Sequence, residues 1–191
     1  MYKKHTFYSY LQEMHDNRRS ALMAIYQDYQ HLFHQAKGST HNHQAWDGGY
    51  ADHLAECFMI NNTVYEALQS IRPLPFSKDS AAVALFFHDI EKPFKNLKSD
   101  DKNVLYWQNH QEITQKSWEK IKFDILEAMK QAYKFNLSDG EMNALLYTHG
   151  EGDDYQKTKR VMTPLAAHVH HCDNTSARIW YDFARQKRTT S

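Results

Sequence analysis

The chain of 191 residues carries 23 Lys and Arg against 23 Asp and Glu, so its formal net charge is zero. That length suits one domain with a full hydrophobic core and is too short for two domains of ordinary size. Because the charges balance, the protein has no overall positive field that would attract a long nucleic acid. The composition combines 13 His and 14% aromatic residues with only 6 Gly and 4 Pro, which favours long helices.

Two cysteines, Cys57 and Cys172, lie within apolar helical patterns. The sequence contains no secretory signal and no long apolar span, so we expect a reduced, cytoplasmic protein with no membrane partner. Neither cysteine needs a disulfide partner on this interpretation.

The first predicted element is a long amphipathic helix from Tyr8 to Ala36. This stretch lacks Gly and Pro and places apolar residues such as Leu22 and Ile25 near helical spacing. We interpret it as a helix that packs over the core. The alternative is a surface that forms a lid or a dimer contact, and a dimer contact would make the protein a homo-oligomer.

A turn-rich loop of residues 37–50 leads into a second predicted helix that ends at about Ile71. His53 stands in its first turn, on one stripe with Cys57. A histidine in such a row is either a satisfied core residue or a ligand. Trp46, in the loop before the helix, is a candidate to stack on a base or to enter the core.

The most informative stretch is AAVALFFHDIEKP, from Ala81 to Pro93, an apolar run that ends in His88 and Asp89. Its length and its Ser-flanked start predict a central helix that is buried on all sides. Burying ionisable groups is costly unless they are paired or bind metal, so the dyad needs a partner; the alternative is a histidine that caps its helix beside a solvated aspartate. Lys92 follows in a lysine-rich loop, where it either faces an anionic substrate or is simply solvated.

Two more histidines lie in helical patterns farther along the chain. His110 belongs to a predicted helix without Gly or Pro, and a capping box of Ser138 and Glu141 precedes a predicted helix of residues 142–149 that ends in His149. Each of these histidines alone is weak evidence for a site.

The last predicted helix starts at Pro164 and carries Asp173 on a stripe with Leu165. A carboxylate with apolar neighbours on its own face needs a cation. That cation is either a metal ion or a salt-bridge partner, for which Arg178 and Arg185 are candidates.

One shared site explains these polar groups better than separate coincidences, because the periodicity of each element directs its group to an apolar interior. Imidazole and carboxylate ligands without thiolate suit divalent Mn, Fe, Co, Ni, Zn or Mg. The set exceeds what one ion needs if positions stay open for substrate, so we predict two ions bridged by Asp89. The predicted metal ligands are His53, His88, Asp89, His110, His149 and Asp173.

The order His, His-Asp, His, His, Asp resembles the HD-domain metal-dependent phosphohydrolase superfamily over about residues 42–184. The segments DGGYADHLAE, FFHDIEKPF and THGEGDD with RVMTPLAAHVHHCDNTSARI carry the resemblance, and the last is most similar to HD-type 3′–5′ exoribonucleases. Two departures are visible. The usual HDxGK is HDIEK, with Glu91 in place of Gly, and the chain has no room for the OB domain of the exonucleases.

The resemblance implies a single all-α HD-type helical bundle over residues 1–191, with residues 1–40 packed on it. It makes His53, His88, Asp89 and Asp173 ligands of one ion, with Asp89 bridging to a second ion held by His110 and His149. It also implies catalytic roles for Asp89 and Lys92, the latter neutralising phosphate charge. Weaker candidates for binding substrate are Arg160, Arg178 and Trp46.

The expected activity is hydrolysis of a nucleotide or a similar small phosphoester by a metal-activated water. A 3′–5′ exonuclease or phosphodiesterase acting on short nucleic acids is the alternative within the superfamily. Some HD-like proteins with the same ligand order are di-iron oxygenases, so oxygenation of a small molecule is the alternative from another reaction class. A non-enzymatic protein on a decayed HD scaffold would not be expected to keep every ligand position.

Overall fold

The structure is a computed structural model that describes residues 7–39, 43–95 and 115–179, so His110 lies outside the described residues. The described residues form helices and no strand, which confirms the predicted all-α class. The elements are α1 (Phe7–Glu13), α2 (Arg19–Gln35), α3 (Gly49–Ile71), α4 (Lys78–Phe87), α5 (Lys92–Lys95), α7 (Gln115–Tyr133), α8 (Asp139–Leu146), the 3-10 turn η1 (Gly152–Asp154) and α9 (Pro164–Ile179).

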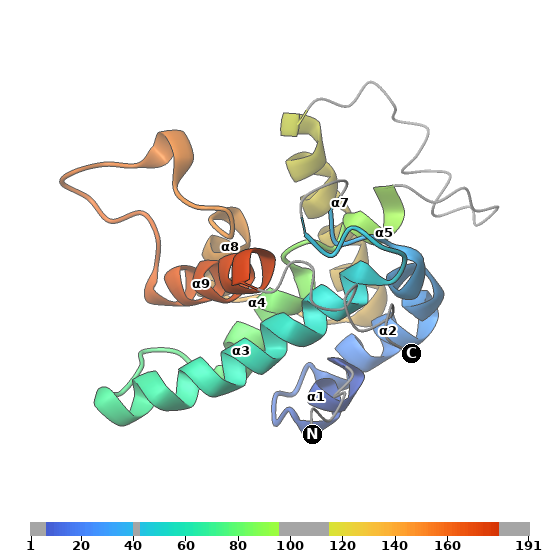
Figure 1. The fold of residues 1–191 in the computed structure, drawn as a ribbon, viewed down its shortest axis with the longest axis horizontal. Helices are drawn as coiled ribbons and strands as arrows, with labels where there is room; N and C mark the ends of the chain where they lie inside the picture. The colour runs from blue at the N-terminus through green and yellow to red at the C-terminus, as the bar shows by residue number, and fades with distance from the viewer. Residues whose placement is uncertain (1–6, 40–42, 96–114, 180–191) are drawn as a thin grey trace.

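Helix α4 lies at the centre, packed against α3, α8 and α9 (Figure 1). Ser77 starts it as predicted, because its hydroxyl accepts a hydrogen bond from the backbone N–H of Ser80 at 3.0 Å. Every residue from Ala81 to Ile90 is buried, as an apolar run without a polar face requires. The helix ends at Phe87, so the His-Asp dyad emerges inside the protein and not at its surface.

The first predicted helix is instead two helices, α1 and α2, separated by residues 14–18. At this break the side chain of Asp16 accepts the backbone N–H of Arg18 at 2.8 Å. The N–H of His15 donates to the carboxylate of Asp79 at 2.8 Å. In a continuous helix these backbone N–H groups would donate to carbonyl groups of the preceding turn. Here the carboxylates accept them instead, which stabilises the break.

Aromatic side chains hold α1 and α2 on the core. Phe7 and Phe33 contact Phe86 of α4 with ring centroids 6.4 Å and 6.0 Å away, and Phe33 meets Tyr50 of α3 edge to face at 5.2 Å. Such pairs stabilise packing beyond the area they bury. The N-terminal region therefore packs over the core, as interpreted from its pattern.

Glu141 connects the N-terminal ends of three helices. Its buried carboxylate accepts both guanidinium N–H groups of Arg18, at 2.6 Å and 2.8 Å, and the hydroxyl of Ser80 at 2.6 Å. It also completes the predicted capping box by accepting the N–H of Ser138. Burial alone would raise the pKa of Glu141, but these donors outweigh it and lower that pKa. The start of α2, α4 and α8 are thus joined at one ion pair.

The predicted helix of residues 142–149 ends three residues early. Helix α8 stops at Leu146, where the hydroxyl of Thr148 donates to the carbonyl of Ala144 at 2.7 Å, and Gly150 adopts a φ of 103°. That left-handed conformation favours glycine. His149 therefore stands in the turn after α8 and not on the helix.

The loop before α3 is held by an unusually close approach. Gln44 has a φ of 40°, and its carbonyl oxygen accepts the N–H of Gly38 at 3.0 Å. A Cβ atom at Gly49 would lie 1.9 Å from that same oxygen, so only glycine fits there. This contact fixes the loop directly beside the first turn of α3.

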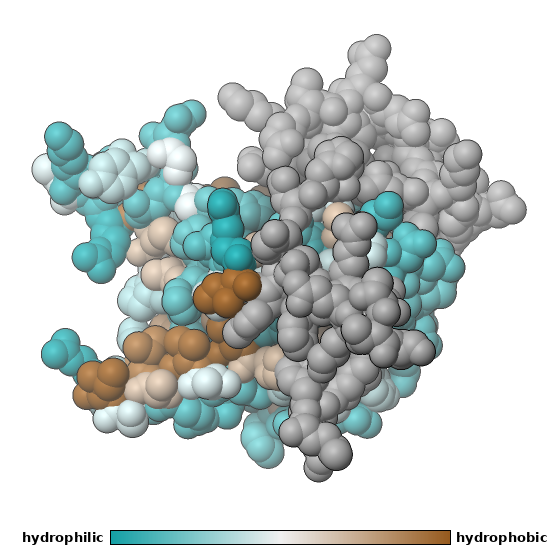
Figure 2. Space-filling view, in the orientation of Figure 1, coloured by the Kyte–Doolittle hydropathy of each residue, from teal (hydrophilic) through white to brown (hydrophobic). Residues whose placement is uncertain are grey.

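The far end of α3 projects from the bundle and carries exposed apolar side chains, of which Ile71 is 80% exposed and Leu68 39% (Figure 2). None of the described helices combines the length and the apolar character needed to cross a membrane.

Candidate metal centre

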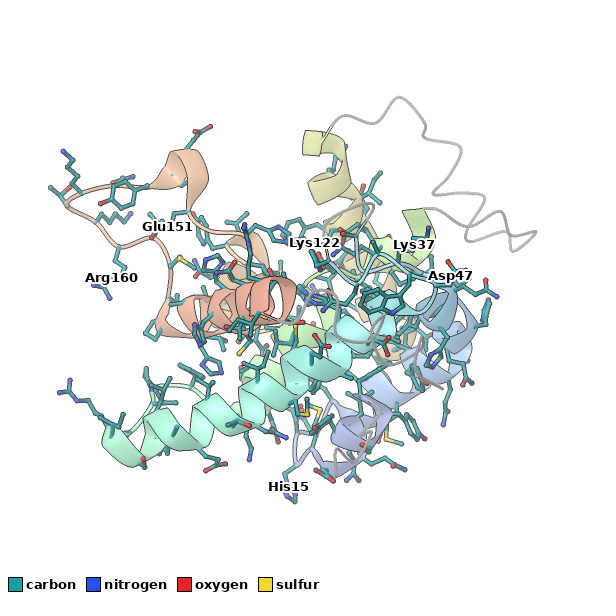
Figure 3. All side chains as sticks on the ribbon, in the orientation of Figure 1. His15, Lys37, Asp47, Lys122, Glu151 and Arg160 are labelled. Carbon is teal, nitrogen blue, oxygen red and sulfur yellow. The ribbon has the colours of Figure 1, made fainter. Side chains whose placement is uncertain are left out.

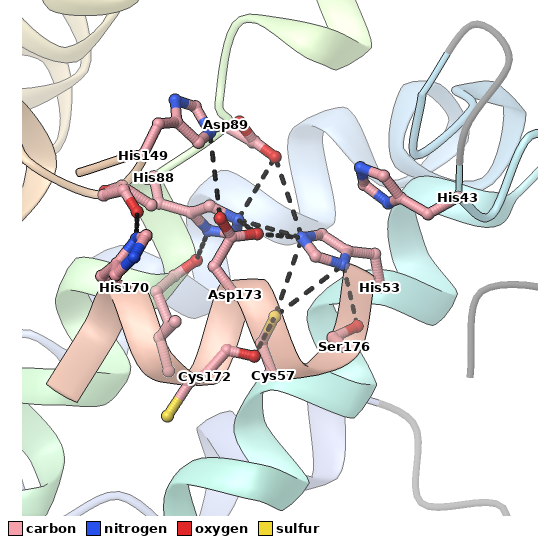
Figure 4. A network of polar contacts seen from close by, with 12 residues as sticks. His43, His53, Cys57, His88, Asp89, His149, His170, Cys172, Asp173 and Ser176 are labelled. Atoms are coloured by element: carbon pink, nitrogen blue, oxygen red, sulfur yellow. Dashed lines mark hydrogen bonds and ion pairs between the residues drawn. The ribbon is translucent and has the colours of Figure 1, made fainter. Parts of the chain in front are cut away.

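His53 lies in the first turn of α3 and is fully buried (Figure 4). Its Nδ1 is 2.9 Å from the hydroxyl oxygen of Ser176 in α9, and that hydroxyl donates to the carboxylate of Glu56 at 2.8 Å. Because the serine has a single proton and gives it to Glu56, Nδ1 of His53 must be the donor. The lone pair of neutral His53 is therefore on Nε2.

His88 caps the C-terminal end of α4, where its Nδ1 is 2.6 Å from the carbonyl oxygen of Leu85. A carbonyl oxygen only accepts, so Nδ1 of His88 carries a proton and Nε2 of the neutral ring carries the lone pair. Metal-binding histidines commonly donate their second ring nitrogen in this way. Both imidazoles are thus set in the tautomer that a metal ion needs.

The two Nε2 atoms face each other at 3.1 Å. With both Nδ1 protons committed elsewhere, these atoms repel as two lone pairs unless a cation lies between or beside them. Asp173 Oδ1 is 3.1 Å from His53 Nε2 and 3.6 Å from His88 Nε2. Asp89 Oδ2 is 3.8 Å and 3.2 Å from the same two atoms. Two imidazoles and two carboxylates therefore converge from α3, the end of α4, and α9.

Each carboxylate also has an oxygen on the side away from these imidazoles. Asp89 Oδ1 is 3.7 Å from His149 Nε2, and Asp173 Oδ2 is 3.9 Å from the same nitrogen. The side chain of His149 is 62% exposed, so this second side opens toward solvent while the first is closed. Each carboxylate thus directs one oxygen toward the paired imidazoles and the other toward His149.

Cys57 adds a sulfur to the group, one helical turn after His53. Its Sγ is 3.7 Å from His53 Nε2, and the ligand atoms of His53, Cys57, His88 and Asp173 all lie within 4.8 Å of one another. This buried group can hold a metal ion. Burial, followed by the nearby carboxylate of Asp173, raises the pKa of the Cys57 thiol well above its usual value. Cys57 and Cys172 are both free, as expected.

The electrostatics favour positive charge in the enclosed half. Burial would lower the pKa of His88, but Asp89 and Asp173 outweigh it and raise that pKa to about 10, whereas burial lowers the pKa of His53 to about 4. Burial would raise the pKa of each carboxyl group, but Lys92 and His88 lower that of Asp89, and hydrogen bonds from His53 and His88 lower that of Asp173. Ionised carboxylates around two imidazoles call for a cation, either a proton or a metal ion.

Asp89 provides an independent sign that a group is missing from its surroundings. The residue is 1% exposed. Its Oδ2 contacts the Lys92 ammonium and lies 3.2 Å from His88 Nε2, whereas the buried Oδ1 has no hydrogen-bond partner among the described residues. Buried carboxylates are normally paired and fully hydrogen-bonded. The residues present therefore fit a bound divalent cation.

The predicted substrate-binding residues have different positions. Lys92 lies beside the dyad through its ion pair with Asp89. The indole N–H of Trp46 donates to Asp52 at 2.8 Å, so it is tied to the first turn of α3. Arg160 stands in the exposed loop between η1 and α9, directed away from the bundle (Figure 3), and Arg178 is exposed in the last turn of α9. Within the described residues neither guanidinium forms a hydrogen bond or ion pair with the centre.

Several neighbours of the centre were not singled out from the sequence. The His43 ring lies 5.3 Å from that of His53 and its Nδ1 contacts the Gln44 side chain at 2.6 Å. Their signal in the sequence is weak, because both stand in a loop without periodicity. Cys57 did share a stripe with His53, and that spacing of four residues was the available signal.

Glu91 and Lys122 form a second pair of charged residues close to Lys92. Burial, then the neighbouring Asp89, raises the pKa of Glu91 to about 7, and Lys122 of α7 opposes this shift. The Lys122 ammonium is buried and donates to the carbonyl of Leu145 at 2.9 Å. His170 of α9 contacts the carbonyl of Thr148 through Nδ1.

No protein-family model, no curated protein and no solved structure matches this chain. The resemblance to HD-domain hydrolases therefore rests on the sequence segments that carry it.

Proposed function

We propose that the protein is a metal-dependent phosphohydrolase of the HD type that acts on a nucleotide or a similar small phosphoester. The observation that carries this proposal is the convergence of His53 Nε2, His88 Nε2 and the two carboxylates of Asp89 and Asp173, beside the Lys92 ammonium. Nitrogen and carboxylate donors of this kind suit Mn²⁺, Fe²⁺, Co²⁺, Ni²⁺, Zn²⁺ or Mg²⁺.

In this proposal the enclosed half holds one ion through His53, His88, Asp89 and Asp173. The carboxylate oxygens that face His149 support a second ion on the accessible side, with Asp89 bridging the two. His110 would complete that second site; it lies outside the described residues. Asp89 is favoured over Cys57 as the remaining ligand of the enclosed ion, because its carboxylate is already ionised whereas burial keeps the thiol protonated.

When bound, such ions supply Lewis acidity, which lowers the pKa of a water molecule and neutralises charge on a phosphoryl oxygen. The chain itself contributes orientation and charge. Hydrogen bonds to Ser176 and Leu85 keep the His53 and His88 rings turned so that both Nε2 atoms face the site. Lys92 holds a positive charge beside Asp89 Oδ2, where it would stabilise the charge that develops on a phosphoryl group.

The substrate class follows from charge. Apart from Lys92, the described basic residues near the centre are few, and the whole chain is neutral. Cations at the centre suffice for one phosphoester, whereas a long polyanion requires a row of basic side chains. A small phosphorylated molecule is therefore preferred over nucleic acid, and a short oligonucleotide is the runner-up.

The test is a substrate panel with Mn²⁺ or Mg²⁺, comprising nucleoside mono-, di- and triphosphates, cyclic nucleotides and short oligonucleotides. Asp173→Asn serves as the matched control for contaminating phosphatases. We expect metal-dependent phosphate release from a mononucleotide by the wild type and none by the variant. Consumption of oligonucleotides alone, most strongly at low salt, would support the exonuclease instead; iron-dependent O₂ uptake without hydrolysis would support an oxygenase.

A further inference from the structure

We infer that Glu56 is a positioning residue for the candidate metal centre: through Ser176 it fixes the tautomer and orientation of His53, and Gln44 locks this connection. The inference rests on the proposed metal-binding function. It concerns residues that do not touch the ion and that the ligand pattern in the sequence does not include.

The connection is a continuous chain of buried hydrogen bonds. The Glu56 carboxylate Oε2 accepts the Ser176 hydroxyl at 2.8 Å, and the Ser176 oxygen faces His53 Nδ1 at 2.9 Å. All three side chains are nearly or fully buried, Glu56 being 8% exposed and the other two 0%. An ionised Glu56 carboxylate can only accept, so the serine hydroxyl donates to it and the serine oxygen accepts from His53 Nδ1.

Gln44 closes the chain from the loop before α3. Its side-chain Nε2 donates to the Glu56 carboxylate at 2.7 Å and also reaches the backbone oxygen of Ser176 at 3.3 Å. Its Oε1 lies 2.6 Å from Nδ1 of His43, so the amide acts as a donor toward Glu56. Gln44 is itself fully buried. One amide thus joins the loop, α3 and α9 around the outer side of His53.

The surroundings of Glu56 argue against a role in stability alone. Among the described residues no Lys or Arg forms an ion pair with this buried carboxylate; its hydrogen-bond partners are Ser176 and Gln44. A buried carboxylate without a cation is unfavourable, and an amide or apolar side chain would fill the same space more cheaply. By contrast, Glu141 has Arg18 as its cation, and its bonds join helices away from the centre. The placement of Glu56 is accounted for by what it does to His53.

The experiment combines two measurements on the full chain. The first uses protein with 15N-labelled histidine, prepared without metal, in which long-range 1H–15N spectra report which ring nitrogen of His53 carries the proton. The signals of His53 are identified by their absence in His53→Gln. The second is the affinity for Mn²⁺ or Zn²⁺, measured by competition with a chelator.

We expect the wild type to show the Nδ1–H form of His53 alone. Ser176→Ala and Glu56→Gln should populate the other tautomer and weaken metal binding by about 10- to 100-fold, the range found when outer partners of ligands are removed. Ser176→Thr, which keeps the hydroxyl, should retain the Nδ1–H form of His53 and the metal affinity of the wild type. Ser80→Ala is the matched control, because it removes a serine-to-glutamate hydrogen bond of 2.6 Å at Glu141 and should change neither.

The outcomes separate this inference from the proposed function. If the wild type binds no divalent ion but the tautomer of His53 still depends on Ser176, the proposed function is wrong and the positioning role stands. If Ser176→Ala and Glu56→Gln fold, keep the Nδ1–H form and bind metal like the wild type, the positioning role is refuted. If Ser176→Ala does not fold, Glu56→Gln and Ser176→Thr give the same decision.

Discussion

Asp89→Asn separates the two donor sets that the centre offers. The asparagine side chain has nearly the same shape, so the change removes one negative charge and leaves the packing around the dyad intact. If Asp89 is a ligand, metal affinity should collapse, whereas Cys57→Ala should leave it almost unchanged. If the sulfur is the ligand, the two variants should behave in the opposite way.

The magnitude follows from the distances at the centre. Asp89 Oδ2 is 3.8 Å from His53 Nε2 and 3.2 Å from His88 Nε2, so a cation bound by these nitrogens would lie within about 4 Å of the carboxylate charge. Two unit charges at about 4 Å interact by about 4 kcal/mol at an effective dielectric constant near 20. Losing that interaction weakens binding by roughly a thousandfold, since about 1.4 kcal/mol corresponds to a factor of ten.

The assay is a chelator competition with Mn²⁺ and Zn²⁺, together with elemental analysis of the purified variants. Thermal unfolding confirms that each variant is folded before its affinity is compared. Asp173→Asn should resemble Asp89→Asn, because both carboxylates face the same imidazoles. Full metal content in Asp89→Asn would refute the bridging role of this residue.

Three further changes test other parts of the structure. Lys92→Ala should keep its metal and lower kcat/KM by about 10² to 10³, in steady-state assays with the phosphoester found in the panel. Glu141→Gln should lower the free energy of unfolding by about 3 kcal/mol in urea titrations at pH 7. The pKa of Glu141 is lower in the folded than in the unfolded protein, so its ionised carboxylate stabilises the fold fully above the unfolded pKa. This stabilisation is lost as the pH falls through the folded pKa, so the free energies of unfolding of wild type and variant should converge in acid. Gly49→Ala places a Cβ against the carbonyl of Gln44, so it should lower the free energy of unfolding by about 1–3 kcal/mol and weaken metal binding. The control is Gly140→Ala, where the nearest atom to the added Cβ is 3.8 Å away, and neither property should change.

The elements with a strong local signal could be predicted from the sequence. The apolar run before His88 has no polar face, so a helix formed by it must be buried on all sides. Residues 81–90 are indeed buried. The serine caps at Ser77 and Ser138 were equally readable, because a cap depends on neighbours only three residues away. By the same logic Pro164 marked the start of α9.

Features that depend on distant partners were not predictable in this way. The break between α1 and α2 uses Asp79, which lies 64 residues from His15. The outer hydrogen bonds of His53 come from Ser176, 123 residues away, and no periodicity in either helix indicates that contact. Cys57 shared a stripe with His53, yet only the packing of α3 on α9 shows that its sulfur reaches the same group.

The order in which fold and ion assemble follows from what holds the helices in place. Helix α4 is fixed by contacts that involve no candidate ligand, including the stacking of Phe87 on Phe135 at 5.2 Å and the Ser80 bond to Glu141. Metal binding becomes the source of folding energy only when the site is absent from the metal-free chain. Here the imidazole orientations are set by Ser176 and Leu85, so we expect the metal-free chain to have the same arrangement.

Chelator-treated protein should therefore keep its helical circular dichroism and a cooperative thermal transition. Adding an ion at about 100 times its Kd should then stabilise the fold by about 2.7 kcal/mol, which raises Tm by roughly 5–11 °C for a chain of this size. Asp89→Asn should show the same transition without the increment. If the chelator instead unfolds the wild type, the ion creates the arrangement of His53 and His88, and the distances between their nitrogens cannot be the cause of metal binding.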